Sequence, residues 1–202
     1  MIFDERNALN QMLFLQINAG TATPTWLIDS ALVMAQDLIF VLPVLLLSLW
    51  LWGGDTRRTA AFKALGVALF ALGVNLAIGY FWPEPRPFML GVGHTWLPHA
   101  ADAAFPSDHM TVFMSIGLAL WLAGLRGVGL AVLVAAGMVA WARVFLGVHF
   151  PLDMLGSVGV AAISTAVVLR GWRYGGGALQ AVAVRLYHRL LARPIRAGWI
   201  RP

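Results

Sequence analysis

The chain has 202 residues, of which 60% are hydrophobic and 11% are charged, and its net charge is +5. Soluble domains have about 45–50% apolar and about 25% charged residues, so this composition indicates an integral membrane protein and excludes an ordinary soluble domain. The sequence contains no cysteine, which excludes disulfides and thiolate metal sites.

The first segment, 1–25, predicts a short helix that lies on the membrane surface. Its sequence "FDERNALNQMLFLQIN" repeats apolar residues at helical spacing and has its charges, Asp4 to Arg6, at the start. Residues 19–24 include glycine, threonine and proline, which end the helix. Trp26 then suits the membrane interface at the start of the first span.

Apolar stretches long enough to cross a bilayer, which takes about 20 residues per helix, follow along the chain. They cover residues 31–52, 61–82, 108–125, 127–147 and 153–172. These stretches predict an all-α fold. We expect a polytopic bundle of about five transmembrane helices with interfacial helices, forming a single integral-membrane domain over residues 1–202.

Basic residues are concentrated in the connections that follow the first, third and fifth spans. Because basic connections stay in the cytoplasm, this bias predicts an N-terminus outside and a C-terminus inside. The same bias accounts for the high pI, so we do not expect nucleic acid as a partner. The residues concerned are Arg57, Arg58, Lys63, Arg126, Arg170, Arg173, Arg185, Arg189, Arg193, Arg196 and Arg201.

Two long polar segments lie outside the predicted spans. Residues 83–107, "PEPRPFMLGVGHTWLPHAADAAFPS", cannot continue a helix and predict a functional loop on the outer side. Phe88 and Trp96 favour an ordered loop because they supply apolar anchors. Residues 173–202 predict a basic cytoplasmic tail that begins as an amphipathic helix on the inner leaflet and is interrupted at Pro194.

Ionisable and polar residues recur at the predicted outer ends of the spans. Such residues cost about 2.5–3.5 kcal/mol on insertion and indicate a functional site. Ser107 fits the N-cap of the third span, whose free N–H groups would face an anion, and Pro151 fits the first turn of the fifth. Arginine binds phosphate oxygens, and of two histidines one can attack phosphorus while the other protonates a leaving oxygen. The residues at these ends are Arg86, Ser107, Asp108, His109, Arg143, His149 and Asp153.

These residues lie in three short motifs: "PRP" at 85–87, "PSDH" at 106–109 and "ARVFLGVHFPLD" at 142–153. In order and spacing they resemble the signature motifs of the type 2 phosphatidic acid phosphatase superfamily, which has a haloperoxidase-like helical fold. The stretches "PRPF" and "HAADAAFPSDHMTV" look like the bacterial undecaprenyl-diphosphatase branch linked to bacitracin resistance. The resemblance implies a polyprenyl diphosphate substrate and an active site that faces the outside of the bacterial inner membrane.

The resemblance also implies roles for individual residues. His149 would form a phosphohistidine, Asp153 would fix its tautomer, and His109 would protonate the leaving phosphate. No metal ion and no cofactor are implied. The groups implied to bind the phosphoryl group are Arg86, Arg143, Ser107 and the backbone N–H groups of Asp108 and His109.

Two positions depart from the family motifs. The motif lysine falls on Gly79 and the serine before Arg143 is Ala142, so two arginines are left to carry the anion. Three further residues of the loop, His94, His99 and Asp102, are secondary candidates that would bind a second phosphate or only be solvated.

Other interpretations remain open on the sequence alone. The same motifs suit a phosphatase or phosphotransferase for phosphatidylglycerophosphate, phosphatidate or lipid A, because they recognise only the phosphoryl group. A non-catalytic membrane carrier or a scaffold with a degenerate site is a second class, and His149 with Asp153 would then be a capping pair. The sequence predicts neither the tail length of the lipid nor the oligomeric state.

Overall fold

A computed structural model describes residues 2–202, and their side chains from residue 8 onward. This part of the chain forms helices, turns and loops and contains no strand, which confirms the all-α prediction. The charges predicted at the start of the first helix, Arg6 among them, lie outside the described side chains. The α-helices are α1 (Ile2–Ile17), α2 (Thr25–Leu32), α3 (Val41–Leu51), α4 (Asp55–Phe81), α5 (Asp108–Leu122), α6 (Arg126–Phe145), α7 (Pro151–Leu190) and α8 (Ala192–Arg196).

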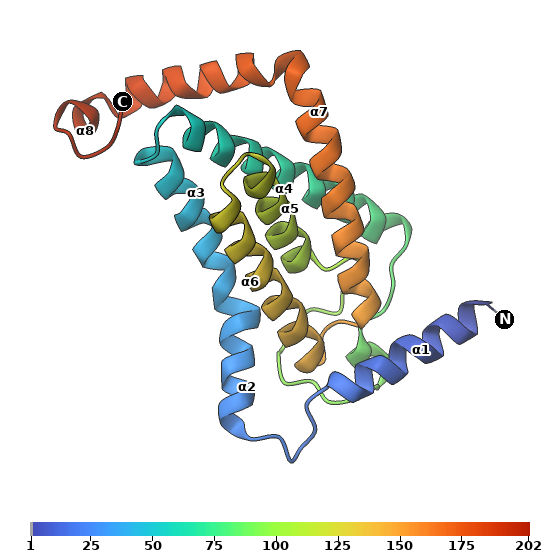
Figure 1. Cartoon of the computed structure of the whole chain (residues 1–202). Helices are drawn as coiled ribbons and strands as arrows, with labels where there is room; N and C mark the ends of the chain where they lie inside the picture. The colour runs from blue at the N-terminus through green and yellow to red at the C-terminus, as the bar shows by residue number, and fades with distance from the viewer. Residues whose placement is uncertain (1) are drawn as a thin grey trace.

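The core of the bundle forms around α5. Figure 1 shows this helix in the middle, with α4, α6 and α7 packed around it. Small residues let the helices approach closely, as is common inside membranes. On α4 these are alanines at intervals of three or four residues, all at most 3% exposed: Ala60, Ala64, Ala68 and Ala71.

Each predicted span corresponds to a helical segment, but the third one is short. Four helical segments of the described residues are long and apolar enough to cross a membrane: Thr25–Leu51, Asp55–Phe81, Arg126–Phe145 and Pro151–Leu190. The first combines α2 and α3 through a π-helical turn (Val33–Asp37) and a 3-10 turn (Leu38–Phe40). The expected third span is α5, which has 15 residues and is about 22 Å long, against about 30 Å of hydrocarbon. A full crossing by α5 therefore stays a prediction.

The fifth span and the basic tail are one helix rather than two. α7 is continuous over 40 residues, so no break separates the span expected to end at residue 172 from the helix that begins the tail. Figure 1 shows α7 rising along the bundle and then turning to run across its end. Gly175, Gly176 and Gly177 lie in this helix, and a Cβ on Gly176 would overlap the ring of Trp172. Glycines let a helix bend without a break.

The two ends of the bundle differ in character. At one end, called here the basic end, lie the α3–α4 and α5–α6 turns and the second half of α7 (Figure 1). Arg58 is only 2% exposed there and lies over the rings of Trp50 and Tyr187. It donates hydrogen bonds to the carbonyls of Arg201 and Pro202 and so fixes the tail. The opposite end, called the site end, carries the loop between α4 and α5, α1 and the α6–α7 turn.

The loop at the site end is tied by hydrogen bonds and packing to three other parts of the chain. The backbone N–H of Trp96 bonds to Leu146 O at 2.9 Å and its indole to Ala19 O at 2.8 Å. Asn18 exchanges hydrogen bonds with the backbone of His94. One buried anchor of the loop is Leu97, which is 2% exposed and packs with apolar residues of α2 and α6.

Candidate active site

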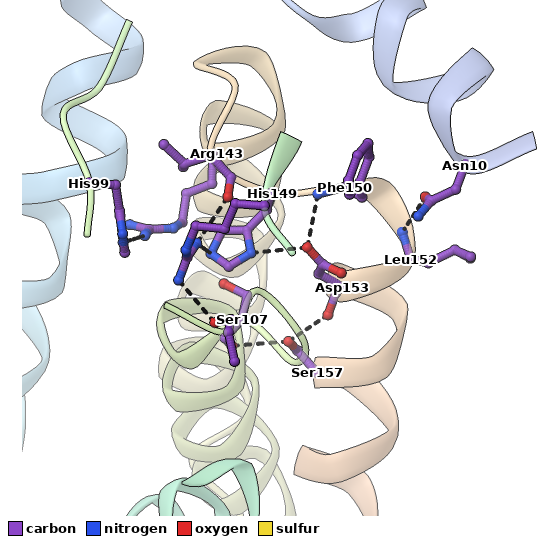
Figure 2. A network of polar contacts seen from close by, with 12 residues as sticks. Asn10, His99, Ser107, Arg143, His149, Phe150, Leu152, Asp153 and Ser157 are labelled. Atoms are coloured by element: carbon purple, nitrogen blue, oxygen red, sulfur yellow. Dashed lines mark hydrogen bonds and ion pairs between the residues drawn. The ribbon is translucent and has the colours of Figure 1, made fainter. Parts of the chain in front are cut away.

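A buried histidine and aspartate occupy the start of α7. His149 and Asp153 are 2% and 4% exposed, and His149 Nδ1 lies 3.1 Å from Asp153 Oδ2 (Figure 2). The same carboxylate oxygen accepts the N–H of Phe150 at 2.9 Å, which caps the helix. A carboxylate only accepts, so Nδ1 carries the proton and Nε2 keeps its lone pair. Pro151 occupies the first turn, as predicted.

Arg86 lies on the other side of the imidazole. Its Nη1 donates to Val148 O at 2.9 Å and lies 3.1 Å from His149 Nε2, the nitrogen with the lone pair. Its Nε donates to Asp102 Oδ1 at 2.8 Å, and its Nη2 to Ala103 O at 3.2 Å. The loop therefore fixes the guanidinium of Arg86, which is 5% exposed, directly against the nitrogen that can act as a nucleophile.

Arg143 provides a second buried guanidinium near the end of α6. It is 3% exposed, and its Nη1 donates to Ala35 O at 3.1 Å. Its Nη2 lies 3.1 Å from His99 Nε2, so this nitrogen of His99 is the acceptor and its proton sits on Nδ1, near Ala100 O. Arg143 Nε has no hydrogen-bond partner among the described residues.

The N-terminus of α5 faces the same region. Ser107 is the N-cap, as predicted, but its hydroxyl makes no capping bond, and Oγ is buried without a partner among the described residues. Its carbonyl accepts the hydroxyl of Ser157 at 3.0 Å, which ties α5 to α7. The first N–H groups of a helix lack acceptors within the helix. Unpaired donors at Arg143 and at this helix end suit an anion with several oxygens.

Burial and the charges around His149 keep its ring neutral. Burial is the largest cause that lowers its pKa well below the ordinary value of 6.5, and the positive charge of Arg143 and then of Arg86 adds to it. His99 and His109 act in the same direction. The ring of His99 lies 6.4 Å from that of His149, and burial lowers the pKa of His99 as well. The neutral form is the one that can attack phosphorus.

Comparison with known proteins decides the family. The model of the PAP2 superfamily matches residues 60–176, more than half of the chain, and this range includes Arg86, Ser107, Arg143, His149 and Asp153. The chain belongs to the PAP2 superfamily. The fold class expected from the three motifs is confirmed by this match.

Individual relatives agree with the PAP2 assignment. The chain is 40% identical over 196 residues to "Putative undecaprenyl-diphosphatase YbjG" of Escherichia coli (strain K12), covering 96% of this chain and 98% of that one. It is 33% identical to the undecaprenyl-diphosphatase BcrC of Bacillus subtilis (strain 168), covering 77% and 80%. The crystal structure of Aquifex aeolicus LpxE shares the fold, with a TM-score of 0.69 at 23% identity, covering 80% of this chain and 95% of that one.

The structure shows what surrounds the two positions that depart from the PAP2 motifs. At Gly79, a Cβ would touch the Cβ of Ala103 at 3.4 Å, so the loop that holds Arg86 packs where the motif lysine would start. Ala142 is fully buried in an apolar cluster. Neither position contributes a charge to the site.

Two of the three secondary candidates in the loop contact the arginines of the site, and the third does not. Asp102 contacts Arg86 and His99 contacts Arg143. His94 is exposed, and it is its backbone rather than its ring that bonds to Asn18. His109 is partly buried in the first turn of α5.

Sequence reasoning missed three polar residues that support the PAP2 site. Ser157 bonds to Ser107 O, and Asn10 accepts the N–H of Leu152 at 3.1 Å. Asn75, buried on α4, donates to Asp108 Oδ1 at 2.8 Å. A lone amide in an apolar span is costly and is a signal that could have identified Asn75. Serine is common in membrane helices, so no comparable signal identifies Ser157.

Proposed function

We propose that this protein hydrolyses undecaprenyl diphosphate to undecaprenyl phosphate and inorganic phosphate through a phosphohistidine. The observation that carries the proposal is the arrangement around His149. Its Nδ1 is held by Asp153, its Nε2 keeps the lone pair, and Arg86 and Arg143 supply cations beside it. This is a nucleophile with an orienting partner and an anion site.

In the first step, His149 Nε2 attacks the terminal phosphorus of the diphosphate. The bond from that phosphorus to the bridging oxygen breaks, and undecaprenyl phosphate leaves with this oxygen, which His109 protonates. Arg86 Nη1, now at 3.1 Å from Nε2, transfers its hydrogen bond to a phosphoryl oxygen. Asp153 stabilises the positive charge that develops on the imidazole.

In the second step, water attacks the phosphohistidine. His109 accepts the proton from the water, the P–N bond breaks, and inorganic phosphate is released with His149 neutral again. Arg143 Nε and Ser107 Oγ, which are unpaired among the described residues, bind phosphoryl oxygens in both steps. We propose the same role for the free N–H groups of Asp108 and His109.

A lipid substrate is supported by the surroundings of the site. The site lies at one end of an apolar helical bundle. A cavity of about 590 Å³ borders Asp153, and its walls are mostly apolar. Relatives at 40% and 33% identity carry undecaprenyl-diphosphatase names, which favours this lipid over phosphatidate. In this proposal the protein recycles the carrier lipid of cell-wall synthesis.

Phosphate release by purified protein in detergent with a chelator tests the proposal. Undecaprenyl diphosphate, phosphatidate and phosphatidylglycerophosphate are compared for the wild type, His149→Ala and the control His188→Ala, which changes an exposed histidine at the basic end. We expect undecaprenyl diphosphate to be hydrolysed fastest by the wild type and the control, and not at all by His149→Ala. Equal rates on phosphatidate would reject the substrate, and loss of activity in chelator would reject the metal-free mechanism.

A further inference from the structure

Asn75 links the middle of the bundle to the N-terminus of α5. Its side chain is 3% exposed, and Nδ2 donates to Asp108 Oδ1 at 2.8 Å and to Thr111 Oγ1 at 3.0 Å. The hydroxyl of Thr111, which is fully buried, lies 3.4 Å from Asn75 Oδ1. Both donor hydrogens of the amide are therefore directed to the first turn of α5.

Asp108 brings a negative charge to a site that binds an anion. It directly follows Ser107 and precedes His109, and its carboxylate is attracted by the guanidinium of Arg143. A carboxylate and a phosphoryl group compete for the same guanidinium, because arginine binds both through pairs of oxygens. Asp108 is exposed, so packing alone does not hold its side chain in place.

We propose that Asn75 is a positioning residue that holds the carboxylate of Asp108 against α4 and so keeps it from occupying Arg143 in place of the phosphoryl group. This inference rests on the phosphoryl site proposed above, but not on the identity of the lipid. When the amide is removed, Asp108 is free to pair with Arg143, and every phosphate ligand must then displace it. Binding weakens, whereas the chemical step after binding is unchanged.

A double-mutant cycle tests this role in the full chain. The wild type, Asn75→Ala, Asp108→Gly and the double variant are compared for KM, kcat and inhibition by orthovanadate. We expect Asn75→Ala to raise KM and the vanadate inhibition constant about ten-fold, the effect of one hydrogen bond to a charged group, with kcat changed less than about two-fold. In the Asp108→Gly background the same substitution should change neither constant.

Two further variants separate charge positioning from helix packing. Asn75→Leu keeps the number and branching of the side-chain heavy atoms, removes the donor and should match Asn75→Ala. Thr111→Val removes only the hydroxyl that also contacts Asn75 and should leave KM near the wild-type value. The proposal is overturned if Asn75→Ala and Asn75→Leu raise KM equally in both backgrounds, or if neither raises it in the wild-type background.

The cycle also distinguishes this role from the choice of substrate. It is run on whichever of undecaprenyl diphosphate and phosphatidate the wild type hydrolyses. Turnover of phosphatidate alone would reject the proposed lipid while the cycle still reports on Asn75. Without turnover of either lipid, the shift in melting temperature with orthovanadate replaces KM, and the expected pattern across the four proteins is the same.

Discussion

At the scale of single residues, His149 has a pH dependence whose direction follows from its surroundings. Burial first, and then Arg143 and Arg86, lower the pKa of its ring well below 6.5. A lowered pKa keeps His149 neutral as the pH falls, so the decline in phosphohistidine formation that protonation of this nucleophile causes should begin only below pH 6.5. In Arg143→Gln one opposing cation is lost, the pKa rises, and the decline moves to higher pH. Quenched-flow measurement of the phosphoenzyme at several pH values checks the wild type and Arg143→Gln. A shift of the decline to lower pH in Arg143→Gln would contradict the role given to the Arg143 charge.

The hydrogen bond from His149 Nδ1 to Asp153 makes a second prediction. Asp153→Asn can offer an amide N–H to Nδ1, which places the ring proton on Nε2 and removes the lone pair that attacks. We expect kcat to fall by about 10³-fold or more, by analogy with the same change in serine proteases, and KM to change little. Steady-state kinetics with labelled substrate measure both constants. Wild-type kcat in this variant would mean that Asp153 serves only as the cap of α7.

The sequence was informative about this site for a specific reason. Short motifs contain Arg86, Ser107, Arg143 and His149, so the types and spacing of these residues can be recognised without a structure. What could not be predicted are contacts made by packing of remote elements, such as Arg143 with the carbonyl of Ala35 across 108 residues. Every residue has a backbone carbonyl, so the residue type does not indicate which carbonyl will accept such a hydrogen bond.

At the scale of elements, one glycine couples the long loop to the α6–α7 turn. Gly147 has φ +85°, and a Cβ there would overlap the carbonyl oxygen of His94. Gly147→Ala must therefore strain the turn or push the loop away, together with the contacts of the loop to Arg86 and Arg143. We expect at least a ten-fold loss of kcat/KM and a destabilisation of roughly 1–2 kcal/mol, measured by activity and by thermal unfolding in detergent.

A matched control for this substitution lies in α6 itself. A Cβ on Gly137 would meet no atom within 4 Å, and the residue is helical and exposed. Gly137→Ala should keep full activity and raise the stability by about 1 kcal/mol at most. Equal losses of activity and stability in Gly147→Ala and Gly137→Ala would show that an added methyl group is harmful at either position. The α6–α7 turn would then have no special role.

The extents of the helices were predictable only in part. Hydropathy located α4 and α6 to within a few residues at the site end of the bundle, because a long apolar run has few alternatives in a membrane. It could not give the π-helical turn at Val33–Asp37, which no residue type specifies, or the continuity of α7 through three glycines. Glycine is usually taken as a sign of a helix break, yet here the second half of α7 continues and its Tyr187 packs against Arg58 of α4.

At the scale of the whole molecule, the bundle has opposite chemistry at its two ends. The site end brings together the groups that bind and attack phosphorus, whereas the basic end carries most of the arginines. Connections rich in arginine and lysine remain in the cytoplasm. We therefore propose that the site end faces outward across the bacterial inner membrane, where the diphosphate released by wall synthesis would reach it.

Labelling of single cysteines tests this orientation, and the cysteine-free chain provides the background without further changes. His94→Cys places a thiol at the exposed loop of the site end, and Thr56→Cys places one at the exposed start of α4 at the basic end. With a membrane-impermeant maleimide, intact spheroplasts should label only His94→Cys, because the membrane shields Thr56→Cys until the cells are permeabilised. The reverse pattern would place the phosphoryl site in the cytoplasm, and the positive-inside rule would then fail for this protein.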